Sequence, residues 1–127
     1  MVEKKKIISY HDLEIWKRGI QLVKELYKIT SEFPKSEIYG LTSQIQRAAV
    51  SFPANIAEGW GRESSKNYIQ FLRNSRGSLF EMDTLIIIAY KLNYIDKKTL
   101  NPILNEIKEL GKMLNSIIKK INERIQE

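Results

Sequence analysis

The chain has 127 residues, 43% of them hydrophobic and 28% charged, which fits one globular domain and excludes a disordered chain. It contains no cysteine, so disulfides, thiol chemistry and thiolate metal sites are excluded, and a reducing, cytoplasmic setting is expected. Lysine and arginine outnumber aspartate and glutamate by 21 to 15. The net charge of +6 favours polyanionic partners such as nucleic acid, although it also serves solubility.

Residues 1–11 are predicted to form a basic N-terminal tail, and residues 12–127 a single four-helix bundle domain. Lys4, Lys5 and Lys6 are followed by only two apolar residues, too few for the core of a signal peptide. No later apolar run approaches the length of a membrane span. We therefore expect no membrane partner.

The first helix is predicted to begin at Asp12, whose carboxylate suits an N-cap. It is predicted to end before Phe33-Pro34, because the residue before a proline is disfavoured in the α region. Apolar residues recur along it at steps of three and four, which predicts one buried face. The predicted face consists of Leu13, Trp16, Ile20, Val23 and Tyr27.

The second helix is predicted to run from about Ser36 to Glu58, with Gly59 as its C-terminal stop. Pro53 lies inside this helix and has no backbone N–H, so a kink or local break is expected between Ala49 and Pro53. The predicted core face consists of Ile38, Leu41, Ile45, Ala48, Phe52 and Ile56.

A third helix is predicted from a cap at Ser64 or Ser65 to about Asn93. Residues 85–88 are apolar all round, which predicts burial on every side, by the bundle or by another subunit. The buried side is marked by Phe71 or Leu72, Leu79, Met82, Ile86 and Ala89.

The fourth helix is predicted to begin at a cap on Asp96 and to carry a 3.5-residue apolar repeat typical of coiled-coil packing. Four long helices with short connections pack as antiparallel neighbours. The predicted fold class is therefore all-α, an antiparallel up-down four-helix bundle. The repeat consists of Leu100, Ile103, Ile107, Leu110, Leu114, Ile117 and Ile121.

Residues suited to catalysis are scarce. His11 is the only histidine and immediately precedes the first predicted helix, and the Glu-x-x-His pairs of di-iron bundles are missing. Gly59-Trp60-Gly61 has neither the strand nor the lysine of a phosphate-binding loop. We therefore expect no enzyme activity, no metal and no cofactor, since catalysis would have to use carboxylates and lysines alone.

A line of polar residues follows one side of the second helix, and a matching set follows the third. One interpretation makes Glu58 and Glu81 a carboxylate pair for acid/base catalysis or a metal site. The other is a hydrogen-bonded network that fixes helix register or a subunit interface. We favour the network because no histidine or nucleophile accompanies the carboxylates. Its predicted members are Gln44, Ser51, Asn55, Glu58, Ser78 and Glu81.

Basic residues gather at helical spacing in two places, where they predict contacts to phosphates. Trp60 lies beside the second group, where its ring either stacks on an unpaired base or plugs the end of the bundle; we favour the plug. The predicted nucleic-acid-binding residues are Lys17 and Lys24 of the first group and Arg62, Lys66, Arg73 and Arg76 of the second.

Several blocks of this sequence resemble the signature of four-helix-bundle proteins encoded in intervening sequences of 23S ribosomal RNA genes. The blocks are Tyr39-Gly40-Leu41, Gln44, Arg47-Ala48-Ala49, residues 51–59 and Gly77-Ser78-Leu79, with Asp12-Leu13, Trp16, Phe33-Pro34, Glu37, Arg62 and Glu81 fitting the same pattern. Asn74-Ser75-Arg76 departs from it, because small apolar residues usually precede the glycine.

That family includes the accessory variability determinant of diversity-generating retroelements. The resemblance therefore implies a homopentameric ring, and in the retroelement branch a basic pentamer binds a reverse transcriptase and nucleic acid. Two functions are expected. The first is a non-catalytic, oligomeric protein that binds RNA or DNA, and the second is a scaffold that recruits a partner enzyme such as a reverse transcriptase.

Overall fold

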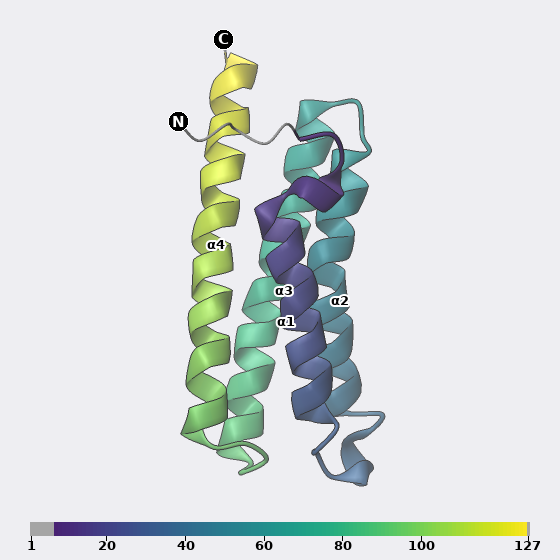
Figure 1. The fold of residues 1–127 in the computed structure, drawn as a ribbon, viewed down its shortest axis with the longest axis vertical. Coiled ribbons are helices and arrows are strands. Elements are labelled where there is room, and N and C mark those ends of the chain that lie inside the picture. The colour runs from purple at the N-terminus through teal and green to yellow at the C-terminus, as the bar shows by residue number, and fades with distance from the viewer. Residues whose placement is uncertain (1–6, 127) are drawn as a thin grey trace.

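The protein is an antiparallel four-helix bundle in a computed structural model that describes residues 7–126. Its helices are α1 (Glu14–Thr30), α2 (Leu41–Trp60), α3 (Ser65–Lys91) and α4 (Lys97–Gln126), with short 3₁₀ helices η1 (Tyr10–Asp12) and η2 (Lys35–Glu37) before α1 and α2. Successive helices run in opposite directions, so the start of α1 and the end of α4 lie at the same end of the bundle (Figure 1). The predicted all-α, four-helix fold is confirmed.

The helices are arranged around the bundle in chain order. Both α1 and α3 pack against α2 and α4, whereas the described parts of α1 and α3 lie diagonally opposite each other without a close approach of their backbones. Two glycines permit close helix packing: a Cβ at Gly19 would lie 2.8 Å from the Phe52 ring, and one at Gly59 would lie 2.7 Å from the Phe71 Cβ.

Along the described chain, no helix is long and apolar enough to span a membrane.

The buried face of α1 was predicted only in part. Leu13, Trp16 and Val23 are partly buried and pack against the core, as expected. The residues that enter the core are Ile15, Gly19, Leu22, Leu26 and Thr30, whereas Ile20 is 43% exposed and Tyr27 45% exposed. Both sets recur at steps of three and four, so periodicity alone does not separate them. The contact of Gly19 with Phe52 selects the observed set, because only a residue without a side chain fits there.

Asp12 does not cap α1, which begins two residues later. Its Oδ2 accepts hydrogen bonds from the backbone N–H groups of Ile8 (2.9 Å) and Ser9 (3.1 Å), and these bonds close η1. They also hold the pKa of Asp12 below its ordinary value. The predicted tail therefore acquires structure from Ser9 onward, while Lys4, Lys5 and Lys6 lie outside the described residues.

The observed α2 begins and ends at other residues than predicted, and it is not interrupted at Pro53. It begins at Leu41, which leaves Ile38 outside the helix and 54% exposed, and it continues through Gly59 to Trp60. The helix runs unbroken through Pro53, so the expected local break is absent. Pro53 is buried and faces the gap left by Gly19, with its Cβ 3.5 Å from where a Cβ on that glycine would lie. Packing against α1 thus holds the proline in place.

The predicted caps of α3 and α4 are confirmed. Ser64 Oγ accepts from the Asn67 N–H at 3.4 Å, and Asp96 Oδ1 accepts from the Thr99 N–H at 3.0 Å, which lowers the pKa of Asp96. α3 ends in a Schellman motif in which Asn93 adopts a left-handed conformation (φ 64°) and the Tyr94 N–H donates to the Ala89 carbonyl. Local sequence therefore defines these helix ends.

The apolar turn of α3 and the end of α4 are buried only in part. Leu85 and Ile86 are buried as expected, whereas Ile88 is 41% exposed in the single chain. Near the end of α4 Ile118 is buried, and the predicted Ile117 and Ile121 pack against the core while partly exposed. The buried face of a straight α-helix drifts in this way from a strict 3.5-residue repeat.

Polar side chains also tie the helices together. The guanidinium of Arg18 on α1 pairs with Glu106 on α4, which raises the pKa of Arg18. At the other end of the bundle, Tyr94 Oη donates to Glu37 Oε2 at 2.7 Å. This bond lowers the pKa of Glu37 and raises that of Tyr94.

Candidate nucleic-acid interface

The hairpin of α3 and α4 carries most of the positive charge of the described residues. α3 has four lysines and arginines against two acidic residues, and α4 has seven against three. α2 has one of each sign. Lys66 and Arg73 are exposed on α3 and Lys119 on α4, and Arg76, Lys108 and Lys112 line a groove between the two helices.

The three α4 lysines are the part of this surface that sequence reasoning missed. Lys108 and Lys112 line a groove between α3 and α4 together with Arg76. Their signal was present, since Lys108, Lys112 and Lys119 recur at steps of four and seven.

Two of the predicted arginines are already engaged within the chain. Arg76 Nη1 donates to Asn115 Oδ1 on α4 at 3.0 Å, so its partner is a neutral amide. Arg62 pairs with Glu58, and its guanidinium lies 5.0 Å from the centre of the Phe71 ring. Lys66 and Arg73 make no ion pair with any described residue.

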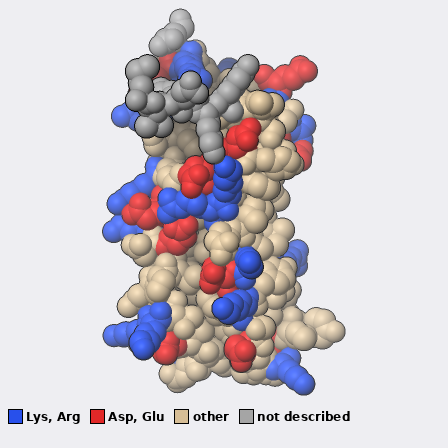
Figure 2. Space-filling view, in the orientation of Figure 1, with Lys and Arg blue, Asp and Glu red and all other residues tan. Residues whose placement is uncertain are grey.

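The structure does not bring all six predicted residues together. Lys17 and Lys24 are exposed on α1, which lies diagonally across the bundle from α3. On the face that carries α1 and α4, lysines and arginines alternate with acidic residues (Figure 2). Within one chain, Lys17 and Lys24 therefore lie on a surface separate from that of Lys66 and Arg73.

Trp60 lies at the end of the bundle. It is the last residue of α2, is half-buried, and its ring packs edge-on against Tyr68 with 6.2 Å between ring centres. Burial raises the pKa of Tyr68. This packing supports a plug at the bundle end more than a free platform for a base.

Part of the predicted polar network is joined by hydrogen bonds across the α2–α3 contact. Ser78 Oγ donates to Ser51 Oγ at 2.9 Å, and Asn55 Nδ2 donates to the Ser51 carbonyl at 2.9 Å and to its Oγ at 3.0 Å. Ser75, which was not predicted, is fully buried and donates to the Phe52 carbonyl at 2.9 Å. These bonds fix the register of the two helices.

The other three predicted members lie outside these bonds. Glu58, near the end of α2, pairs with Arg62 in the connection between α2 and α3. Gln44 and Glu81 form no side-chain hydrogen bond with another described residue; together with Arg47 they line a shallow hollow between α2 and α3.

The α2–α3 register separates the two carboxylates once considered as a pair. Ser51 lies opposite Ser78; Glu58 is seven residues beyond Ser51 towards one end, and Glu81 is three beyond Ser78 towards the other. Ten residues of helix correspond to about 15 Å. That distance is too great for Glu58 and Glu81 to share a proton, a metal ion or one substrate bond.

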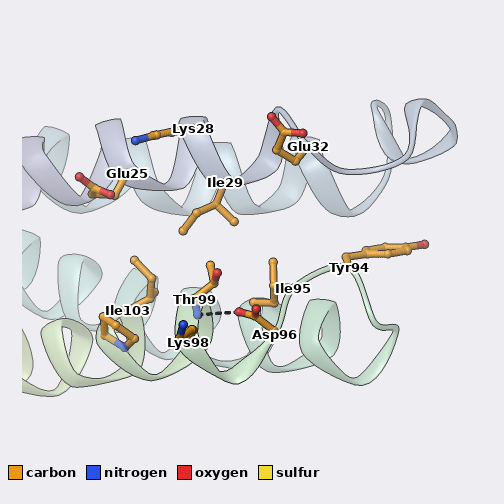
Figure 3. Close-up of a pocket in the computed structure, with 11 residues that line it drawn as sticks. Glu25, Lys28, Ile29, Glu32, Tyr94, Ile95, Asp96, Lys98, Thr99 and Ile103 are labelled. Atoms are coloured by element: carbon orange, nitrogen blue, oxygen red, sulfur yellow. Dashed lines mark hydrogen bonds between the residues drawn. The ribbon is translucent and has the colours of Figure 1, made fainter.

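A hollow of about 520 Å³ lies between the end of α1 and the start of α4 (Figure 3). Ile29, Ile95 and Ile103 supply its apolar surface. Its charges are mixed, with Glu25, Glu32 and Asp96 against Lys28 and Lys98. Because Asp96 is committed to capping α4, the hollow offers no converging set of groups for one ligand.

Comparison with known proteins agrees with this architecture. A crystal structure of a protein with unknown function from the S23 ribosomal protein family of Bacteroides thetaiotaomicron VPI-5482 superposes with a TM-score of 0.75. The two are 23% identical over 83% of this chain and 98% of that one, so this likeness concerns the fold. The chain matches none of the curated proteins. The family model of the 23S rRNA-intervening sequence protein matches residues 11–116, and the chain therefore belongs to that family.

Proposed function

We propose that this protein is a non-catalytic, homo-oligomeric nucleic-acid-binding bundle. The observation that carries the proposal is the concentration of positive charge on the α3–α4 hairpin, beside a nearly uncharged α2. Lysines and arginines at helical spacing present donors to successive phosphates, and such binding needs no base-specific contact. We assign the phosphate contacts first to Lys66 and Arg73, which form no ion pair with an acidic residue in the described part of the chain, and then to Lys119.

Assembly into a ring, which the family resemblance implies, is part of this proposal. Ile20 and Tyr27 on α1 and Val50 on α2 are each more than 40% exposed. Ile88 on α3 and Leu92, the residue that follows α3, are exposed as well, and α3 lies diagonally opposite α1. Two unlike apolar patches on different sides suit head-to-tail contacts, which close into a ring. A ring would also bring Lys17 and Lys24 of several copies onto one assembly and multiply its charge.

Binding is tested by fluorescence anisotropy with single-stranded RNA, single-stranded DNA and a structured RNA at two salt concentrations. The double variant Lys66→Glu/Arg73→Glu is compared with Lys28→Glu/Lys35→Glu, which makes the same charge change at the other end of the bundle, outside the α3–α4 hairpin. We expect micromolar binding at low salt that weakens steeply with salt, and a loss of about tenfold or more in the first variant only.

Two results would contradict the proposal. One is the absence of any anisotropy change at micromolar protein and low salt. The other is equal weakening by both double variants, which would mean that only net charge matters. Light scattering tests the assembly separately, with Val50→Glu expected to lower the particle mass and a monomeric wild-type protein counting against the ring.

A second candidate function is a scaffold that recruits a partner enzyme, such as a reverse transcriptase. The observation that favours it is Phe80, a large apolar side chain that is 68% exposed in the middle of α3. Exposed aromatic residues beside an apolar groove are typical of protein-binding surfaces. Pull-down of a polymerase encoded beside this gene would support this function, and loss of capture in a Phe80→Ala variant would assign it to this surface.

A further inference from the structure

An apolar groove of about 580 Å³ lies between α3 and α4 on the basic side of the bundle. Leu79, Leu104 and Ile107 line it with aliphatic side chains, and Phe80 stands beside them. Leu79 and Ile107 also belong to the hydrophobic core, so the groove opens directly onto the rigid interior packing. Phe80 is 68% exposed, which leaves a large apolar surface in water.

Gly111 deepens the groove at its centre. It lies in the middle of α4, where glycine weakens a helix relative to alanine. A Cβ at this position would meet Leu79 Cδ1 at 3.9 Å, an ordinary contact, so the fold itself does not require a glycine. The missing side chain instead keeps the groove open between Leu104 and Asn115.

The rim of the groove is basic. Arg76 is held in place by its hydrogen bond to Asn115, and Lys108 and Lys112 follow along α4. Lys112 approaches Glu109 only at 3.8 Å on an exposed surface, a contact too weak to occupy it. Asp83 is the one carboxylate among the lining residues, so the rim has a net positive charge.

We propose that this groove binds an acidic amphipathic helix of a partner protein. The lined part of α4, from Leu104 to Asn115, is about 16 Å long, which matches three turns of a docked helix. Such a helix places apolar anchors at i, i+3 or i+4, and i+7 into an aliphatic groove, and its flanking Glu or Asp residues pair with Arg76, Lys108 and Lys112.

The same features disfavour nucleic acid as the occupant. Strand binding relies on a series of aromatic platforms, whereas this groove has one phenylalanine among aliphatic side chains. Asp83 at the groove would also repel phosphate. This inference rests on the second candidate function, the scaffold that recruits a partner protein, and is independent of nucleic-acid binding. It names the surface that the scaffold uses and the kind of helix that binds there.

The test uses the full chain and a fluorescein-labelled peptide of about three to five turns with leucine at i, i+3, i+4 and i+7 and glutamate on the remaining face. A control peptide has lysine in place of every glutamate. We expect micromolar binding of the acidic peptide and binding of the basic peptide at least about tenfold weaker.

Variants then locate the site. Phe80→Ala and Gly111→Leu, which fills the groove without changing charge, should each weaken the acidic peptide about fivefold or more. Lys108→Glu/Lys112→Glu should abolish the preference for the acidic peptide. Ile125→Ala removes an exposed apolar side chain of α4 outside the groove and should leave the affinity unchanged. Circular dichroism verifies that each variant is folded.

Several outcomes would overturn the inference: no binding at about 100 µM peptide, equal binding of both peptides, or unchanged affinity in Phe80→Ala and Gly111→Leu. A fall in particle mass in Gly111→Leu would make the groove a contact between copies of this chain. Displacement of the peptide by single-stranded RNA that itself depends on Phe80 would make the groove a nucleic-acid site. The nucleic-acid titration of the Lys66→Glu/Arg73→Glu variant tests a different surface, so its result does not depend on the outcome of the peptide experiments.

Discussion

Replacing Gly59 by alanine should destabilise the protein, although alanine is the better helix former. The added Cβ would lie 2.7 Å from Phe71 Cβ, 2.8 Å from Tyr68 Cδ1 and 3.3 Å from the Tyr68 carbonyl oxygen. Carbon atoms in good contact are separated by about 3.5–4.0 Å, so the gap is short by about 1 Å. Phe71 Cβ is attached to the α3 backbone and cannot swing away, so α2 and α3 must move apart.

The expected size of the effect follows from two opposing contributions. Overpacking of this kind destabilises the folded protein by about 1–3 kcal/mol. Replacing a helical glycine by alanine stabilises the helix by about 0.5–1 kcal/mol. The free energy of unfolding should therefore fall by about 1–2 kcal/mol. For a domain of this size the midpoint of thermal unfolding should drop by about 3–8 °C.

The matched control is Gly77→Ala. Gly77 is also helical, but a Cβ there would meet nothing within 4 Å, so only the helix-propensity gain remains. This variant should be more stable than the wild type by about 0.5–1 kcal/mol. Both are measured by circular dichroism in urea and on heating, at one fixed protein concentration because assembly contributes to stability.

The reasoning fails if the unfolding midpoint of Gly59→Ala is equal to or above that of the wild type, because α2 and α3 could then move apart at little cost in free energy. It also fails if Gly77→Ala is destabilising at a concentration where the protein is monomeric. A loss of stability seen only in the assembled protein would place the Gly77 backbone against another subunit.

Three further predictions use the same unfolding assay. Ser75→Ala should lower the free energy of unfolding by about 1 kcal/mol, since it removes a fully buried hydrogen bond to the Phe52 carbonyl, and a neutral result would mean that this bond adds nothing. Asp96→Asn keeps the α4 cap but removes its titration. Because the pKa of Asp96 is held below 3.8 in the folded state, its charged form stabilises the protein above about pH 4, and this contribution is lost as the pH falls through the folded value. The stability difference between wild type and Asp96→Asn should therefore shrink between about pH 5 and pH 2, and a constant difference would contradict it. Arg18→Lys should lose about 0.5–1 kcal/mol, less in high salt, because lysine cannot form the forked pair with Glu106; salt-independent loss would point to packing instead.

The existence of the four helices and two of their caps were predictable because they depend on neighbouring residues. Ser64 and Asp96 each accept a backbone N–H three residues ahead, a bond that needs no other part of the fold. The apolar repeat of α4 was visible for the same reason. It is correct up to the last turns, where Ile118 is buried and the predicted Ile117 and Ile121 are partly buried.

The candidate site was predictable only in part. Lys66 and Arg73 were recognised by their helical spacing, but the lysines of α4 join them only through the α3–α4 packing. Lys17 and Lys24 share the same kind of spacing, yet α1 lies diagonally opposite α3. The side on which a basic residue ends up depends on which face of its helix is buried and which helices are its neighbours.

By itself, the sequence determined the helices, two caps, the fold class and the resemblance to the family, because short-range periodicity and local hydrogen bonds encode them. Only the tertiary structure decided which stripe of α1 enters the core, how Pro53 stays in an unbroken helix, and that Glu58 and Glu81 lie far apart. Each depends on contacts between residues distant in the chain, above all the approach of Phe52 to Gly19 and the pairing of Ser51 with Ser78. Such contacts leave no periodic signal in a single sequence.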